Sequence, residues 1–144
     1  MKVVVQRVKE ASCKVDGKIT GKIDKGLMIL VGFTYGDNEK NIEAMVQKIV
    51  NLRIFDDENG IMNLSVLDIG GSILSISQFT LYADTKKGNR PSYINAMKGE
   101  EAIKLYELFN QKLSEVIHIE KGVFGADMDI SLINSGPTTI ILER

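Results

Sequence analysis

The sequence predicts a single α+β domain in which two helices pack against a largely antiparallel sheet or a partly closed β-barrel. Segments with strand-like hydrophobic patterns lie near both ends of the chain, and two internal segments change to helical periodicity. The chain has 144 residues and shows no linker, internal repeat or low-complexity segment. A chain of this length buries enough surface to fold as one unit, so residues 1–144 are expected to form one domain.

The first third of the chain is expected to form three strands. Residues 3–15 begin with a run of valines and predict one long strand, with an irregularity near Glu10–Ser12. Asp16-Gly17 is a hairpin signal, and Lys18–Ile23 alternates in polarity as a half-buried strand does. The continuous apolar run Leu27–Val31 is typical of a strand buried on both faces.

Two helices are expected further along the chain. Residues 38–52 place apolar side chains at helical spacing, and Asp37 or Asn38 can cap the start of that helix. The second helix is expected over residues 94–114 or 98–114. One face of this second helix is apolar and consists of Ala102, Ile103, Tyr106, Phe109 and Leu113.

The remaining segments complete the sheet and its connections. Residues 56–60 are typical of a turn, and residues 85–91 are typical of a polar loop. The other strand-like segments are residues 72–79, 116–120, 129–134 and 138–143.

The composition excludes several function classes. The formal net charge of −1 argues against broad nonspecific binding of nucleic acid but allows a local basic patch. The single cysteine, Cys13, excludes an intramolecular disulfide and fits a reducing cytosol, so a cytoplasmic location is expected. With one cysteine and one histidine, no ligand cluster has useful spacing, so neither a metal nor another cofactor is expected. No stretch has the length of a membrane span, so no membrane partner is expected.

The segment Ser77-Gln78-Phe79-Thr80 follows an apolar run and gathers hydroxyl and amide groups. A catalytic triad needs a base within hydrogen-bond reach of its nucleophile. The single histidine, His118, lies in a separate apolar segment, where an ordinary structural histidine is favoured. Taken alone, the segment is therefore either a structural strand end or part of a site that works without a triad.

Two further segments are candidates for binding. Lys86, Lys87 and Arg90 form a basic loop shortly after Thr80, which is either a solvated loop or a phosphate contact beside a site. Gly136-Pro137 interrupts two strand-like segments, and proline cannot donate to a sheet ladder. An X-Pro bond can be cis, and glycine permits close approach of another molecule. This pair therefore predicts a rigid backbone edge that selects ligands by their shape.

Together these segments resemble the D-aminoacyl-tRNA deacylase family, of the D-tyrosyl-tRNA deacylase type. The resemblance covers essentially the whole chain, and the order and spacing of its pieces make it specific. The pieces are Val5-Gln6-Arg7-Val8, Ala11-Ser12, Val15-Asp16-Gly17, Gly26-Leu27, Ser77-Gln78-Phe79-Thr80-Leu81-Tyr82, Lys87-Gly88-Asn89-Arg90-Pro91-Ser92, Gly122-Val123-Phe124-Gly125-Ala126-Asp127-Met128 and Asn134-Ser135-Gly136-Pro137-Thr138-Thr139.

The resemblance implies a cytoplasmic homodimer that hydrolyses the ester joining a D-amino acid to the terminal ribose of tRNA. It implies activity on glycine mischarged on a tRNA, sparing of L-aminoacyl-tRNA, and assistance from the 2′-hydroxyl of the substrate. It implies that Gly136-Pro137, with a cis bond, of one subunit reaches into the active site of the other and is braced by Arg7. The segment 77–80 is then expected to hold the ester and terminal adenosine, and Met128 to line the pocket.

The sequence departs from the usual family pattern at three positions. Ser135 and Thr138 stand where the family commonly has aspartate and valine around Gly-Pro, and Ala83 stands where glycine is common. These changes keep the Gly-Pro step, so they bear on substrate tuning more than on the reaction. Two alternatives stay open: the Thr80 hydroxyl as nucleophile, which needs a base, and a noncatalytic RNA-binding module. The near-neutral charge and the absence of tryptophan disfavour such a module.

Overall fold

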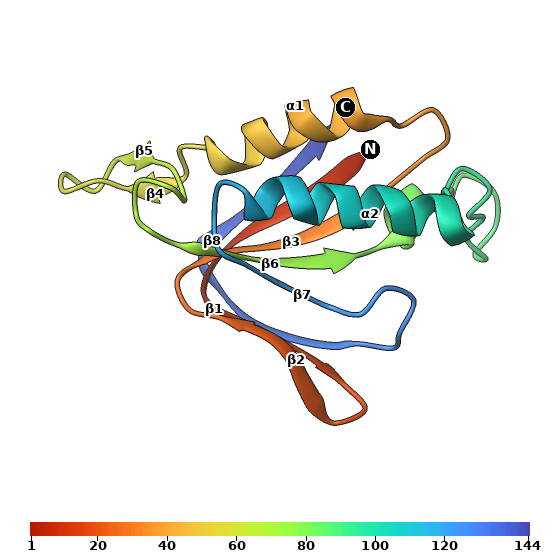
Figure 1. Ribbon diagram of the computed structural model, residues 1–144, viewed down its shortest axis with the longest axis horizontal. Helices are drawn as coiled ribbons and strands as arrows, with labels where there is room; N and C mark the ends of the chain where they lie inside the picture. Colours follow the sequence, from red (N-terminus) through yellow and green to blue (C-terminus); the bar gives the residue numbers. More distant parts are fainter.

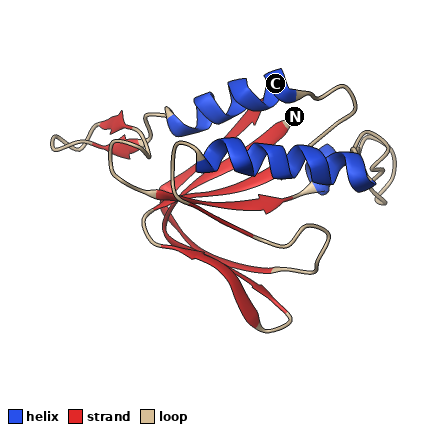
Figure 2. Ribbon diagram, viewed as in Figure 1, coloured by secondary structure: helices blue, strands red, loops and turns tan.

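The computed structural model describes every residue from Met1 to Arg144. Two helices lie side by side over one face of a six-stranded mixed sheet that is nearly closed into a barrel (Figures 1 and 2). The elements are β1 (Lys2–Val15), β2 (Lys18–Ile23), β3 (Gly26–Gly32), α1 (Glu39–Val50), β4 (Phe55–Asp56), β5 (Met62–Leu64), β6 (Ser72–Ser77), the 3₁₀ turn η1 (Phe79–Tyr82), α2 (Gly99–Ser114), β7 (Ile119–Lys121) and β8 (Asp129–Glu143). Neither helix is long and apolar enough to cross a membrane.

The long strand β1 organises the sheet. It pairs antiparallel with β2 and β3 along one edge and with β8 along the other. Beyond β3 the sheet continues in parallel through β6 and β7. The predicted single α+β domain with two packed helices is confirmed, but the sheet is mixed, because α1 and α2 each lie in a crossover that returns the chain in the same direction.

The sheet curls until β2 approaches β7. Gly21 of β2 permits this approach, since a Cβ there would lie 3.0 Å from the Lys121 carbonyl oxygen. The curl separates two apolar cores. The larger core lies between the sheet and the helices, and the smaller lies inside the curl, where it contains the fully buried Cys13 together with Val8, Ala11, Ile23, Met28, Leu74 and Ile76.

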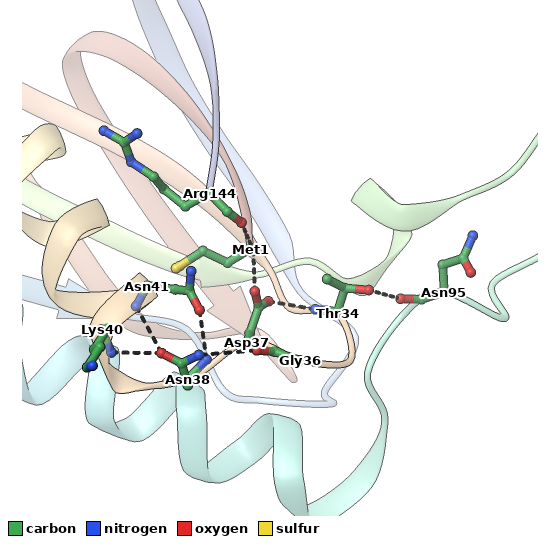
Figure 3. A network of polar contacts seen from close by, with 9 residues as sticks. All are labelled: Met1, Thr34, Gly36, Asp37, Asn38, Lys40, Asn41, Asn95 and Arg144. Carbon is green, nitrogen blue, oxygen red and sulfur yellow. Dashed lines mark hydrogen bonds and ion pairs between the residues drawn. The ribbon is translucent and has the colours of Figure 1, made fainter.

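The start of α1 is fixed by a capping box. The Asn38 side chain accepts hydrogen bonds from the amides of Lys40 and Asn41, at 3.0 and 3.4 Å. In return, the Asn41 side chain accepts one from the amide of Asn38 at 3.1 Å (Figure 3). Of the two caps that the sequence allowed, the structure uses Asn38. Asp37 instead accepts hydrogen bonds from the Thr34 amide and from the terminal ammonium of Met1 (Figure 3).

Several boundaries differ from the sequence prediction. The strand predicted over residues 72–79 ends at Ser77, and η1 begins at Phe79. The strand predicted over residues 116–120 begins only at Ile119, because the amides of residues 116 and 117 both donate to the Leu113 carbonyl and extend the end of α2. The second helix begins at Gly99, as in the shorter of the two predicted ranges. The two C-terminal strands form one strand, β8, and the acidic turn lies in a short hairpin of β4 and β5 that was not predicted.

Candidate active site

A cleft of about 280 Å³ lies at the carboxyl ends of the parallel strands β3 and β6. One wall consists of Ser77, Gln78 and Phe79, where β6 ends and η1 begins. The loop between β7 and β8 forms another wall, which includes Met128. Carboxyl ends of parallel strands are a frequent location of ligand sites, and the structure places four of the predicted site residues there.

Local contacts fix the wall made by residues 77–80. The Gln78 amide donates to the Val31 carbonyl oxygen at 2.7 Å, which ties η1 to β3. Gly32 permits this contact, because a Cβ there would lie 2.8 Å from the Gln78 carbonyl oxygen. The Gln78 side-chain amide donates to the Thr80 hydroxyl at 2.5 Å. The η1 turn therefore has one fixed position against the sheet.

Two backbone amides open the η1 turn at this wall, those of Phe79 and Thr80. Among the hydrogen bonds of turns, loops and caps, Gln78, Leu81 and Ala83 donate, but the amides of Phe79 and Thr80 do not. The first amides of a helical turn have no partner within that turn. These two N–H groups are therefore candidates to donate to an oxygen atom of a ligand.

The side chain of Met128 packs against Gly122, which was not among the site residues predicted from the sequence. A Cβ on Gly122 would lie 2.5 Å from the Met128 sulfur, so any larger residue there would displace this side chain. Phe124, another lining residue, packs against Tyr106 of α2 with ring centroids 5.7 Å apart. No local pattern in the sequence signals these contacts, because they join segments that meet only through the fold.

The lining of the cleft contains one carboxylate, Asp127, and no histidine that could pair with it. The carbonyl oxygen of His118 accepts from the Ile73 amide, at the opposite end of β6 from Ser77. Four residues of strand separate Ile73 from Ser77, which corresponds to about 13 Å. The His118 side chain is exposed and lies 3.2 Å from Glu120. The histidine is therefore not positioned to activate Thr80. No group of three histidine, cysteine, aspartate or glutamate side chains lies close enough to hold a metal, and metal independence stays a prediction.

The basic loop is anchored next to the cleft. Lys86, Lys87 and Arg90 are exposed. Asp84 and Ser92 close the loop through paired backbone hydrogen bonds of 2.8 and 2.9 Å. The ring of Tyr93, directly after this closure, packs edge-on against the ring of Phe79 with centroids 5.1 Å apart. The structure thus brings the base of the predicted phosphate-contacting loop to the cleft wall.

Gly136-Pro137 forms an exposed bulge in β8, and its peptide bond is cis. Between the register pairs Gln6–Thr139 and Val8–Asn134, β8 has three more residues than β1, so the chain must bulge there.

The bulge is held by Arg7, which is only 8% exposed. Its Nε donates to the Ser135 carbonyl oxygen at 3.0 Å, and its Nη1 donates to the Ile54 carbonyl oxygen at 2.7 Å. The Thr138 amide donates to the Asn134 side chain at 2.9 Å. These contacts make the exposed edge a fixed one.

The bulge lies far from the cleft of the same chain. In the sheet register, Arg7 is opposite Leu27, and Leu27 is opposite Ile73. On β6 the cleft begins at Ile76, about 10 Å further along the strand direction. On β8 the cleft is lined by Ile130, about 20 Å of strand from Gly136. The predicted site residues therefore form two groups: residues 77–80 with Met128 and the adjoining basic loop, and Arg7 with Gly136-Pro137.

Comparisons with known proteins give the family. The family model described as D-Tyr-tRNA(Tyr) deacylase matches residues 4–143. This chain belongs to that family. A solved structure of a c-Myc DNA unwinding element binding protein is 42% identical, with 100% of this chain and 99% of the other covered, and a TM-score of 0.95. The structure of a probable eukaryotic D-amino acid tRNA deacylase has the same fold, at 15% identity, coverage of 98% and 97%, and a TM-score of 0.84.

Membership of the deacylase family confirms the resemblance found in the sequence and indicates a tRNA carrying a D-amino acid as the class of substrate.

Proposed function

We propose that this protein hydrolyses the ester between a D-amino acid and the terminal ribose of tRNA, releasing both. The match to the deacylase family over residues 4–143 is the observation that carries the proposal. The cleft agrees in size, since small-molecule sites start at about 300 Å³. A volume of about 280 Å³ suits the aminoacyl end of the tRNA alone, with the rest of the nucleic acid outside.

The chemistry fits catalysis by positioning. Attack on the ester carbonyl creates an oxyanion, and the amides of Phe79 and Thr80, at the start of η1, are suited to donate to it. The Thr80 hydroxyl accepts from Gln78, so its own proton is free to be donated to the substrate. The only histidine, His118, lies at the far end of β6 and cannot serve as the base that a Thr80 nucleophile needs. The 2′-hydroxyl of the terminal ribose then assists attack by water, while the protein holds the ester in place.

Selection against L-amino acids is assigned to Gly136-Pro137 of a second subunit. This pair is exposed, fixed by buried Arg7 and remote from its own cleft, so it can serve only the cleft of a partner. L and D forms exchange hydrogen and side chain at the α-carbon. A fixed backbone edge placed where an L side chain projects excludes the L form and accepts any D form. Glycine has no side chain to exclude, so glycyl-tRNA is a substrate as well.

The test is the release of free amino acid from purified D-tyrosyl-, L-tyrosyl- and glycyl-tRNA in the presence of a chelator. We expect cleavage of the D and glycyl substrates and survival of the L substrate. Comparable cleavage of D- and L-tyrosyl-tRNA would refute the chiral mechanism. Loss of activity on chelation, with recovery on adding one transition metal and with the tRNA still folded, would refute metal independence.

DNA binding is a second candidate, because the relative at 42% identity is named as a DNA unwinding element binding protein. A noncatalytic RNA-binding module predicts tight tRNA binding without turnover. Fluorescence titrations with duplex DNA and with uncharged tRNA, both at physiological salt, separate these candidates from the deacylase. The net charge of −1 favours weak binding to duplex DNA. DNA binding stronger than tRNA binding, without any deacylation, would favour the second candidate.

A further inference from the structure

Arg7 has hydrogen-bonding capacity that the protein does not use. A guanidinium carries five N–H donors. Nε and Nη1 donate to the carbonyl oxygens of Ser135 and Ile54, but Nη2 has no acceptor in the structure. The only acid beside the guanidinium is Asp56, whose side chain is half exposed and 3.4 Å away. Nη2 is not among the buried atoms without a partner, so it reaches solvent and can take an acceptor from there. Because the single acidic partner is distant and solvated, an additional anion adds a favourable charge pair at this guanidinium.

A pocket of about 430 Å³ opens onto this guanidinium. Lys9 and Lys25, both exposed, line it together with Arg7. The ammonium of Lys25 lies 5.9 Å from the centre of the Phe55 ring, which defines its position over the pocket wall. Asp56 is the only acidic residue in the lining, so three cations face one carboxylate.

We propose that the Arg7–Lys9–Lys25 pocket binds a phosphate group. Arg7 supplies planar, fixed donors, which suit phosphate oxygens, and the two lysines add charge that a single carboxylate ligand does not require. The Ser135 carbonyl that Arg7 holds belongs to the exposed Gly136-Pro137 bulge, so the pocket adjoins that edge. The source of the phosphate rests on the proposed function: with the bulge in the partner's cleft, this pocket borders that cleft and receives a backbone phosphate near the 3′ end of the tRNA.

The experiment compares the wild type with Lys9→Gln/Lys25→Gln, which removes both charges and keeps the aliphatic stems. The matched control is Lys40→Gln/Lys104→Gln, which makes the same charge change at two exposed lysines outside the pocket. The probes are inorganic phosphate, followed by calorimetry at constant ionic strength, and an uncharged RNA hairpin with a single-stranded 3′ end. We expect the pocket variant to weaken phosphate binding by about 10-fold or more, and the control to leave it unchanged.

The RNA arm identifies the source. Each phosphate contact contributes about one unit to the slope of log K against log salt. A slope that falls by about one in the pocket variant, and not in the control, assigns the phosphate to the RNA backbone. If the pocket variant loses binding of inorganic phosphate but keeps the wild-type salt slope for RNA, the pocket is supported and its ligand is free phosphate.

Two results would overturn the proposal of a phosphate site. The wild-type protein would bind neither probe, or the pocket variant would bind both probes as tightly as the wild type does. These binding readouts are independent of deacylation. A protein that binds phosphate here but does not cleave D-aminoacyl-tRNA therefore contradicts the proposed function and not the pocket.

Discussion

The phenol of Tyr106 donates a hydrogen bond to the carbonyl oxygen of Ser75 at 2.8 Å. This bond joins α2 to β6 directly before Ile76 and Ser77, which line the cleft. Burial raises the pKa of Tyr106, so the phenol stays neutral and able to donate throughout the physiological range. The same carbonyl oxygen also accepts from the Gly122 amide at 3.1 Å, so two segments behind the cleft meet at one atom.

Replacing Tyr106 with phenylalanine removes the bond and keeps the ring. We expect the free energy of unfolding to fall by about 1 kcal/mol, a typical net contribution of one hydrogen bond. Urea unfolding measures the change. Tyr35→Phe is the matched control, because Tyr35 is 59% exposed and its hydroxyl has no partner in the protein. Equal stability of the two variants would show that the Tyr106 bond contributes nothing.

The Thr80 hydroxyl and the substrate 2′-hydroxyl can be compared directly. Thr80→Ala removes the acceptor of the Gln78 side chain but no base, so we expect activity within about 10-fold of the wild type. Removing the terminal 2′-hydroxyl of the substrate should slow cleavage by about 100-fold or more, the lower range of general acid–base effects. Single-turnover rates measure both. A severe loss in Thr80→Ala with little effect of the 2′-deoxy substrate would identify Thr80 as the nucleophile.

The amide of Phe79 can be removed without removing the turn. Proline is tolerated at the first position of a helical turn, and Gln78 before it lies outside the α region that proline disfavours, with φ −148° and ψ 86°. Phe79→Pro should lower the rate of the chemical step by about 100- to 1,000-fold, as expected for the loss of one oxyanion donor.

Phe79→Ala is the control for the ring, since it loses the contact with Tyr93 but keeps the amide. We expect this variant to lose substrate affinity more than rate. If the alanine and proline variants lose the same rate, the ring and not the amide is what matters at this position.

Gly136→Ala tests the backbone edge. Gly136 has φ +125°, and a Cβ there would lie 2.7 Å from Nη2 of Arg7. Both features should displace the bulge, and a misplacement of about 1 Å can cost about 100-fold in activity. Gly60→Ala is the control for strain alone, because Gly60 has φ +75° and open space around a Cβ. We expect both variants to lose stability and only Gly136→Ala to lose deacylation.

Mixing two inactive subunits tests whether the edge acts on a partner. In a hybrid of a Gly136→Ala subunit and a Phe79→Pro subunit, one cleft is intact and receives an intact edge. Random pairing makes half of the dimers hybrids, so about one quarter of the wild-type activity should return after co-refolding. Activity that does not rise above the sum of the separate variants, with hybrid dimers present by mass, would place the edge in its own subunit.

The sequence predicted the parts of this fold that local pattern determines. The helix after Asn38 followed from apolar spacing and a capping residue, and the interruption at Pro137 followed from the missing N–H of proline. The parallel pairing of β3 with β6 was not predicted, because crossover direction depends on how distant segments pack. The packing of Met128 against Gly122 was not predicted either, for the same reason. The candidate site was found by residue type and resemblance, whereas the separation of its two groups required the sheet register.

Cys13 has a practical consequence. It is the only cysteine, it has no exposed surface, and it lies in the small core inside the curled sheet. A thiol reagent can reach it only when that curl opens, and the Gly21–Lys121 approach is where the curl is nearest to closure. The rate of labelling of this one sulfur therefore reports on breathing of the barrel without any engineered probe, and a ligand that tightens the barrel should slow it.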